Sequence, residues 1–178
     1  VQLFGGPDAF EQKLDELFTL DTAVAGERSP DISGLIGQYA HGNEPSHHIA
    51  YLYNYVGAPH KTQDRVRQIM DEMYGPDADG LSGNDDSGQL SAWFVLSSLG
   101  LYQVAPGDRR FALGSPLVRE ATIRLEDGGT FVIRTEGDVA TQHRVARVRL
   151  NNRLIDGLSI AYADVMAGGE LVFELESN

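Results

Sequence analysis

The chain has 178 residues, with 14 Lys and Arg against 26 Asp and Glu, which gives a formal net charge of −12. This negative charge argues against nucleic acid or an anionic membrane surface as a partner, and no apolar run approaches the ~20 residues of a membrane span. A hydrophobic content of 42% indicates a folded protein, and the lack of cysteine excludes disulfides and thiol chemistry.

The first part of the chain, residues 1–106, shows mainly helical periodicity. Apolar residues recur at helical spacing over 10–18, and Asp8 with Glu11 resembles a capping box at the start of that helix. Residues 21–37 are rich in Gly, Ser, Asp and Pro, which predicts a long ordered loop.

Three further helices are expected before residue 106. One begins near Pro45 and ends at Gly57, and the next carries an apolar stripe over 66–73. The last covers about 88–99 and is apolar nearly all round, so we expect it to be deeply buried.

Residues 107–178 follow a β pattern. Alternation over 121–125 and 130–134, on either side of an Asp-Gly-Gly turn, predicts a hairpin. Further strands are expected over 145–150 and 170–175. The sequence therefore predicts an α+β fold, with a helical part followed by an antiparallel β region.

Two adjacent carboxylates, Asp85 and Asp86, lie between Gly83 and Gly88, directly before the apolar helix. Glycines permit tight left-handed turns, and such a loop can hold a carboxylate at the rim of a cavity. Asp is also a favoured N-cap, so either residue could simply cap the helix. The residues alone leave both interpretations open.

A second polar cluster spans residues 41–48. His41, His47 and His48 are most simply hydrogen-bonded core or cap residues. Zinc is disfavoured because cysteine is absent and the histidines lack the HExxH spacing. Asn43 and Glu44 offer hard oxygen ligands, which favour calcium as the metal.

The segments HGNEPSHHIAYLYNY at 41–55 and GLSGNDDSGQLSAWFVLSSLGLYQVAPG at 80–107 resemble the signature segments of glycoside hydrolase family 92. These enzymes are calcium-dependent, exo-acting α-mannosidases, and the resemblance extends over nearly the whole chain. It implies that residues 1–106 are helices of an (α/α)6-toroid-type glycosidase domain. Residues 107–178 would be a C-terminal antiparallel β region packed on it.

The resemblance also implies roles for individual residues. Asp86 is the expected general base, and Asp85 is expected to help position the water or the metal. Asn43 and Glu44 are the expected Ca²⁺ ligands. Gly42 stands where members specific for α-1,2 linkages often carry glutamate, so the linkage preference does not follow. The expected contacts to the sugar are His41, His47, His48 and Asn84.

The implied function is the removal of terminal α-linked mannose from glycans by calcium-assisted, inverting hydrolysis. The general acid of the family is a glutamate upstream of the position matching Phe4, and Glu11 and Glu16 do not stand in such a context. We therefore expect the chain to need a missing N-terminal part of the same protein and to be inactive alone. The resemblance also implies a secreted, periplasmic or cell-surface bacterial protein. The alternatives are a carbohydrate-binding module and a purely structural module.

Overall fold

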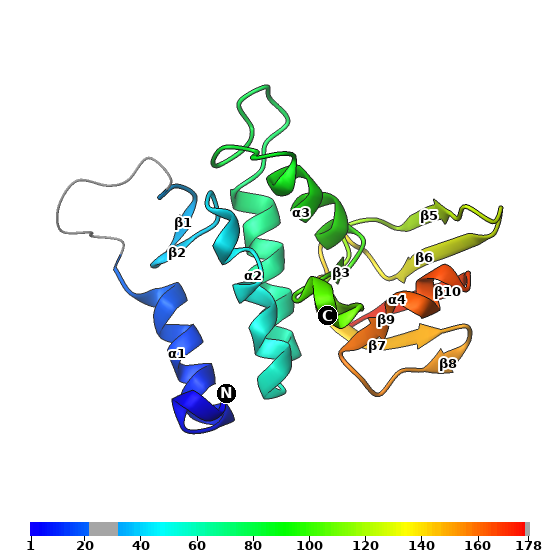
Figure 1. The fold of residues 1–178 in the computed structure, drawn as a ribbon, viewed down its shortest axis with the longest axis horizontal. Helices are drawn as coiled ribbons and strands as arrows, with labels where there is room; N and C mark the ends of the chain where they lie inside the picture. The colour runs from blue at the N-terminus through cyan, green and yellow to red at the C-terminus, as the bar shows by residue number, and fades with distance from the viewer. Residues whose placement is uncertain (22–31, 177–178) are drawn as a thin grey trace.

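The computed structural model describes residues 1–21 and 32–176, with helices in the first part of the chain and sheets in the second (Figure 1). Most of the loop predicted over 21–37 lies outside the described residues. The elements up to residue 98 are η1 (Gln2–Phe4), α1 (Pro7–Thr19), β1 (Leu35–Ile36), β2 (Tyr39–Ala40), η2 (Glu44–Ser46), η3 (Ile49–Val56), α2 (Pro59–Glu72) and α3 (Gln89–Ser98).

The helices expected from periodicity are present, with two differences near their starts. The predicted capping box at Asp8 is wrong, because α1 begins at Pro7 and its N-cap is Gly6, which has no side chain. The segment after Pro45 forms two 3-10 helices, η2 and η3, instead of one α-helix. It ends as predicted at Gly57, whose φ of 78° is left-handed.

Helix α3 is buried on one face only, so the prediction of a deeply buried helix is wrong. Leu90 and Trp93 are fully buried, whereas Val95 is 58% exposed. Within this chain α3 contacts α2 on one side and β3 at its end, and the face that carries Ser91, Ala92 and Val95 is exposed. The apolar composition of this helix therefore does not indicate how many of its faces are covered.

The second part of the chain forms two sheets, confirming the α+β fold. Its elements are β3 (Leu101–Tyr102), η4 (Pro106–Asp108), β4 (Arg110–Leu113), β5 (Glu120–Arg124), β6 (Thr130–Glu136), β7 (Val145–Leu150), β8 (Arg153–Leu154), β9 (Ser159–Ala161), α4 (Tyr162–Met166) and β10 (Gly169–Leu175). The strand orders are β3-β4-β9 and β5-β6-β10-β7-β8.

The predicted β5–β6 hairpin is confirmed, but the β region is not wholly antiparallel. Strand β10 lies between β6 and β7 and runs parallel to β6, with Leu171 opposite Ile133. Four of its side chains are buried, so it needs a central position in the sheet. The predicted boundary at residue 106 falls in η4, between the paired strands β3 and β4, and the division of the chain at this point stays a prediction.

Each part of the chain has its own apolar core. The helical core gathers aromatic side chains of η3 and α3, including Tyr51 and Trp93. The sheet core is centred on Phe131 and Phe173. Within the described residues, no helix is both long and apolar enough to cross a membrane.

Candidate functional site

The two polar segments lie side by side because each has a glycine at the contact. A Cβ added to Gly83 would lie 2.5 Å from the carbonyl oxygen and 2.6 Å from the Cα of Gly42. A Cβ on Gly42 would in turn lie 2.9 Å from the carbonyl oxygen of Ser82. Only glycine allows the two backbones to approach so closely. The segment containing Glu44 is thereby brought against the loop containing Asp86.

Neither aspartate is the N-cap residue of helix α3, which is Gly88, but Asp85 binds the first turn of the helix through Ser91. Its Oδ1 accepts a hydrogen bond from the Ser91 N–H at 2.9 Å, and its Oδ2 accepts one from the Ser91 hydroxyl at 3.0 Å. Its carbonyl accepts the Gln89 N–H at 2.7 Å. The N-cap interpretation is therefore wrong for both aspartates, although Asp85 does hold the start of the helix, and its expected part in positioning the water or the metal stays a prediction.

Asp86 is held differently. Its φ is 34°, and those of Ser87 and Gly88 are 60° and 86°, so three successive residues are left-handed. Non-glycine residues in this region cost of order 1–3 kcal/mol each, and such strain concentrates at functional sites. The turn leaves the Asp86 side chain exposed and directs it towards Glu44.

The carboxyl groups of Asp86 and Glu44 are close enough to share a hydrogen bond. This hydrogen bond, and then the negative charge of Glu44, raise the pKa of Asp86 above its usual value of 3.8. The loop thus presents a carboxylate that is exposed to solvent and more basic than an ordinary aspartate.

Glu44 is half-buried at the start of η2, and its Oε1 is buried without a hydrogen-bond partner among the described residues. A carboxylate oxygen in this state, facing a second carboxylate, fits a cation or a shared proton. Asn43 precedes it and adds an amide oxygen, so the donor set suits Ca²⁺.

Over residues 1–21 and 32–176, no group of three or more His, Asp or Glu side chains is arranged to hold a metal ion. Ca²⁺ takes six to eight oxygen ligands. The residues present therefore fit only part of a calcium coordination shell, and Ca²⁺ binding by Asn43 and Glu44 stays a prediction.

His41 is fully buried, and both of its ring nitrogens are engaged. Nδ1 lies 2.7 Å from the Tyr39 hydroxyl, and Nε2 lies 2.6 Å from the Tyr74 hydroxyl. Tyr74 donates its own proton to the Leu90 carbonyl at 3.0 Å, so it accepts from His41 Nε2–H, and Tyr39 donates to Nδ1. Burial, and then the nearby ring of His47, lower the pKa of His41 to about 3.

His47 is also buried and tied to the protein. Its Nε2–H donates to the His41 carbonyl at 3.0 Å, and its Nδ1 lies 3.3 Å from the side-chain amide of Gln89. Trp93 donates its indole N–H to the His47 carbonyl at 3.0 Å. Burial lowers the pKa of His47, so its ring is held neutral as well.

The structure thus places the predicted sugar contacts in two groups. His41 and His47 connect the 41–48 segment to α3, and their ring nitrogens already have protein partners. His48 is half-buried at the start of η3, and Asn84 is exposed on the loop beside Asp86. Contact of these four residues with a sugar stays a prediction.

Sequence reasoning missed Tyr74, which joins His41 to α3 through its hydroxyl. Its ring is also parallel to Trp93, with centroids 6.0 Å apart. The available signal was an aromatic residue directly before Gly75-Pro76, where the apolar stripe of α2 ends. Periodicity does not identify the hydrogen-bond partners of Tyr74, because His41 and Leu90 are both distant from it in sequence.

Comparison with known proteins supports a relationship along the whole chain. Residues 1–177 match the model of the glycosyl hydrolase family 92 catalytic domain. An uncharacterized secreted glycosidase of Arthroderma benhamiae is 30% identical over 124 residues, which are 70% of this chain and 14% of that protein.

Two solved structures from Bacteroides thetaiotaomicron have the same fold over nearly all of this chain. One is a family GH92 α-mannosidase in complex with mannoimidazole, with a TM-score of 0.91, 38% identity, and coverage of 97% of this chain and 23% of that chain. The other is a family GH92 inverting mannosidase, with a TM-score of 0.84, 33% identity, and coverage of 99% and 25%. This chain spans about a quarter of their length, and it belongs to glycosyl hydrolase family 92.

Proposed function

We propose that these residues carry the general-base half of the active site of an α-mannosidase that removes terminal α-linked mannose from glycans. The family membership and the similarity to the two mannosidases support this substrate class. The observation that carries the proposal is the pairing of Asp86, on the left-handed loop, with Glu44 of η2. It presents a basic carboxylate beside a second polar segment of the family's signature.

The proposed mechanism gives each carboxylate one task. Asp86, when ionised, takes a proton from a water molecule as that water attacks the anomeric carbon. A protonated acid on the opposite face of the sugar donates its proton to the departing oxygen, and the anomeric configuration inverts. The raised pKa of Asp86 makes it a better proton acceptor, provided that the pH keeps it ionised.

Asn43 and Glu44 would hold Ca²⁺ together with oxygens from outside this chain. Bound there, the ion would polarise and orient sugar hydroxyls. The Oε1 of Glu44, which has no partner among the described residues, supports this assignment. We place the acid on a part of the catalytic domain that this chain does not contain, with the helical part, residues 1–106, belonging to an (α/α)6 toroid.

We further propose that the protein acts outside the cytoplasm, either secreted, periplasmic or on the cell surface of a bacterium. The relative from Arthroderma benhamiae is described as secreted, and the two solved structures come from a bacterium. Glycans that carry terminal mannose would then be the physiological partner.

The test compares hydrolysis of an aryl α-mannoside by the full-length protein and by the 178-residue chain. We expect turnover only in the former, with β-mannose as the first product in NMR and loss of activity in EDTA. Asp86→Asn should lower kcat by about 10²–10⁴-fold, the range for removal of a general base. Asp79→Asn, at an exposed turn, should leave it unchanged. Unimpaired turnover in Asp86→Asn would refute the assignment of the base.

A further inference from the structure

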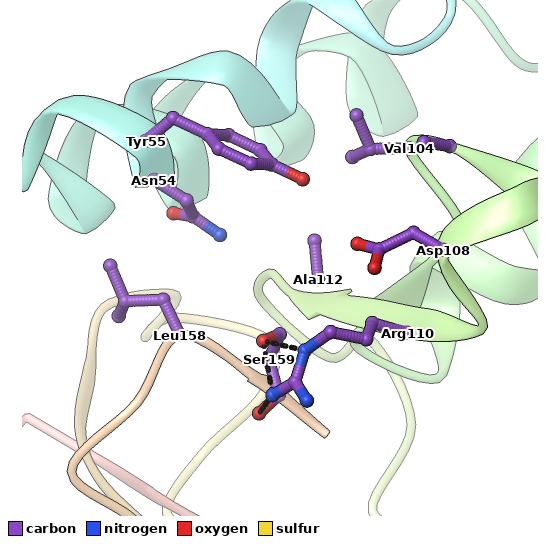
Figure 2. A pocket seen from close by; sticks show the side chains of 9 residues that line it. Asn54, Tyr55, Val104, Asp108, Arg110, Ala112, Leu158 and Ser159 are labelled. Carbon is purple, nitrogen blue, oxygen red and sulfur yellow. Dashed lines mark hydrogen bonds between the residues drawn. The ribbon is translucent and has the colours of Figure 1, made fainter. Parts of the chain in front are cut away.

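A cavity of about 250 Å³ opens between η3 and the β4–β9 pair. Figure 2 shows Tyr55 and Asn54 of η3 on one side, and Arg110 with Ser159 on the other. Asp108 reaches in from η4. The cavity lining contains no residue of the 41–48 or 83–89 segments, so it is separate from the carboxylate pair.

The cavity has unused hydrogen-bonding groups of both kinds. Asn54 offers a ligand little, because its Nδ2 donates to the Leu113 carbonyl at 2.8 Å and its Oδ1 is buried, so the free groups come from Arg110 and Asp108. Arg110 binds the Ser159 hydroxyl through Nε at 2.9 Å and Nη2 at 2.8 Å, and its Nη1 bonds to none of the described residues. The carboxylate of Asp108 makes no hydrogen bond or ion pair with any described residue, and Figure 2 shows it directed into the cavity.

The remaining walls are apolar. Tyr55 is 54% exposed, which is high for a large aromatic residue. It faces Val104 across the cavity, with Ala112 and Leu158 completing the lining (Figure 2). An exposed aromatic ring beside hydrogen-bonding groups suits a ligand with an apolar face and a polar edge.

Charge and size narrow the class of ligand. The carboxylate of Asp108 and the guanidinium of Arg110 balance, so the cavity favours a neutral molecule over an ion. Its volume lies just below the ~300–1,000 Å³ of pockets for drug-sized ligands, which suits one small ring. A pyranose meets these demands, because its hydroxyls are both donors and acceptors and its C–H face can lie on Tyr55.

We propose that this cavity is a second, non-catalytic sugar site that binds one neutral pyranose. The choice of mannose as that pyranose follows from the proposed function, whereas the class of ligand follows from the cavity. Such a site would hold one arm of a branched glycan on the surface while another arm is processed elsewhere.

The test titrates the 178-residue chain with methyl α-mannopyranoside and follows amide resonances by NMR. We expect a dissociation constant in the millimolar range, with shifts centred on Tyr55, Asp108 and Ser159. Tyr55→Ala should weaken binding at least ~10-fold. The matched control is Tyr162→Ala, because Tyr162 is 46% exposed but does not line the cavity, and it should bind like the parent.

Two further variants keep this result separate from the catalytic proposal. Asp108→Asn should weaken binding, whereas Asp86→Asn should leave it unchanged even where it abolishes turnover in the full-length protein. The proposal is overturned if the shifts centre on 41–48 and 83–89, if Tyr55→Ala and Tyr162→Ala bind equally, or if no shift appears. Tighter binding of mannose 6-phosphate than of the neutral sugar would also overturn it.

Discussion

The carboxyl groups of Asp86 and Glu44 lie close together, and this pairing has a measurable consequence. A hydrogen bond and like charge raise the pKa of Asp86 above 3.8, so the ionised base is lost as the pH falls through that raised value. We expect Glu44→Gln to return the pKa towards 3.8, because the amide removes the charge and donates to the carboxylate. A carboxyl-detected NMR titration would measure both values.

The matched control for that titration is Glu126→Gln, which removes an exposed carboxylate on the β5–β6 turn and should leave the pKa of Asp86 unchanged. In the full-length enzyme, the pH below which kcat falls should be lower in Glu44→Gln than in the parent, and it should be unchanged in Glu126→Gln. A parent in which Asp86 already titrates at 3.8 would show that the two carboxylates do not interact.

Single residues also show how far sequence reasoning reached. The residues alone left both aspartates of the loop open as cap or catalytic carboxylate, and the resemblance assigned the base to Asp86, which stays a prediction. The structure shows that Asp85 binds Ser91 in the first turn of α3, whereas Asp86 has a left-handed backbone and lies beside Glu44. The distinction depends on backbone angles and on a partner some forty residues away, and neither leaves a local pattern.

Among the elements, short-range patterns predicted well and long-range packing did not. The β5–β6 hairpin followed from alternation around an Asp-Gly-Gly turn, because its register is set within a few residues. The insertion of β10 beside β6 joins residues about forty positions apart, so periodicity alone did not reveal its direction. The exposed face of α3 was missed for a similar reason, since its composition does not show which neighbours are present.

The contact between the β2–η2 segment and the α3 loop gives a prediction about packing. In Gly83→Ala the new methyl group would meet the Gly42 backbone at 2.5 Å, and backbone atoms are unable to swing aside. We expect the free energy of unfolding to fall by about 1–3 kcal/mol, as in other overpacked sites. Urea unfolding followed by Trp93 fluorescence would measure it.

Gly107→Ala is the matched control, because nothing lies within 4 Å of its added Cβ. Its stability should stay within about 0.5 kcal/mol of the parent. Equal stability of the two variants would show that the two segments do not pack backbone to backbone.

At the scale of the whole molecule, polar contacts join α2 to β7 of the five-stranded sheet and to the two residues before it. Asp64 accepts hydrogen bonds from His143 at 2.8 Å and from Arg144 at 2.9 Å. Beside it, Gln63 accepts the Val145 N–H at 3.1 Å. These contacts connect two separate apolar cores through polar groups, so we expect the connection to respond to pH and salt, whereas the cores do not.

Asp64→Asn tests that connection. Burial raises the pKa of Asp64, but the hydrogen bonds from Arg144 and then His143 outweigh it, so the pKa lies below 3.8. A depressed pKa stabilises the fold above the unfolded value of about 3.9, and this contribution is lost as the pH falls through the folded pKa. Because the pair is partly exposed, we expect Asp64→Asn to lose under ~1 kcal/mol at pH 7.

The stability difference between Asp64→Asn and the parent should become smaller near pH ~2 and in about 1 M NaCl, because protonation and screening weaken the Asp64 contacts of the parent. Urea unfolding at each condition would measure it, with Asp79→Asn as a control in an exposed turn that should match the parent throughout. A deficit of the same size at every pH and salt concentration would mean that the amide introduced by Asp64→Asn disturbs packing instead. The two cores would then be joined by side-chain packing and not by electrostatic interactions.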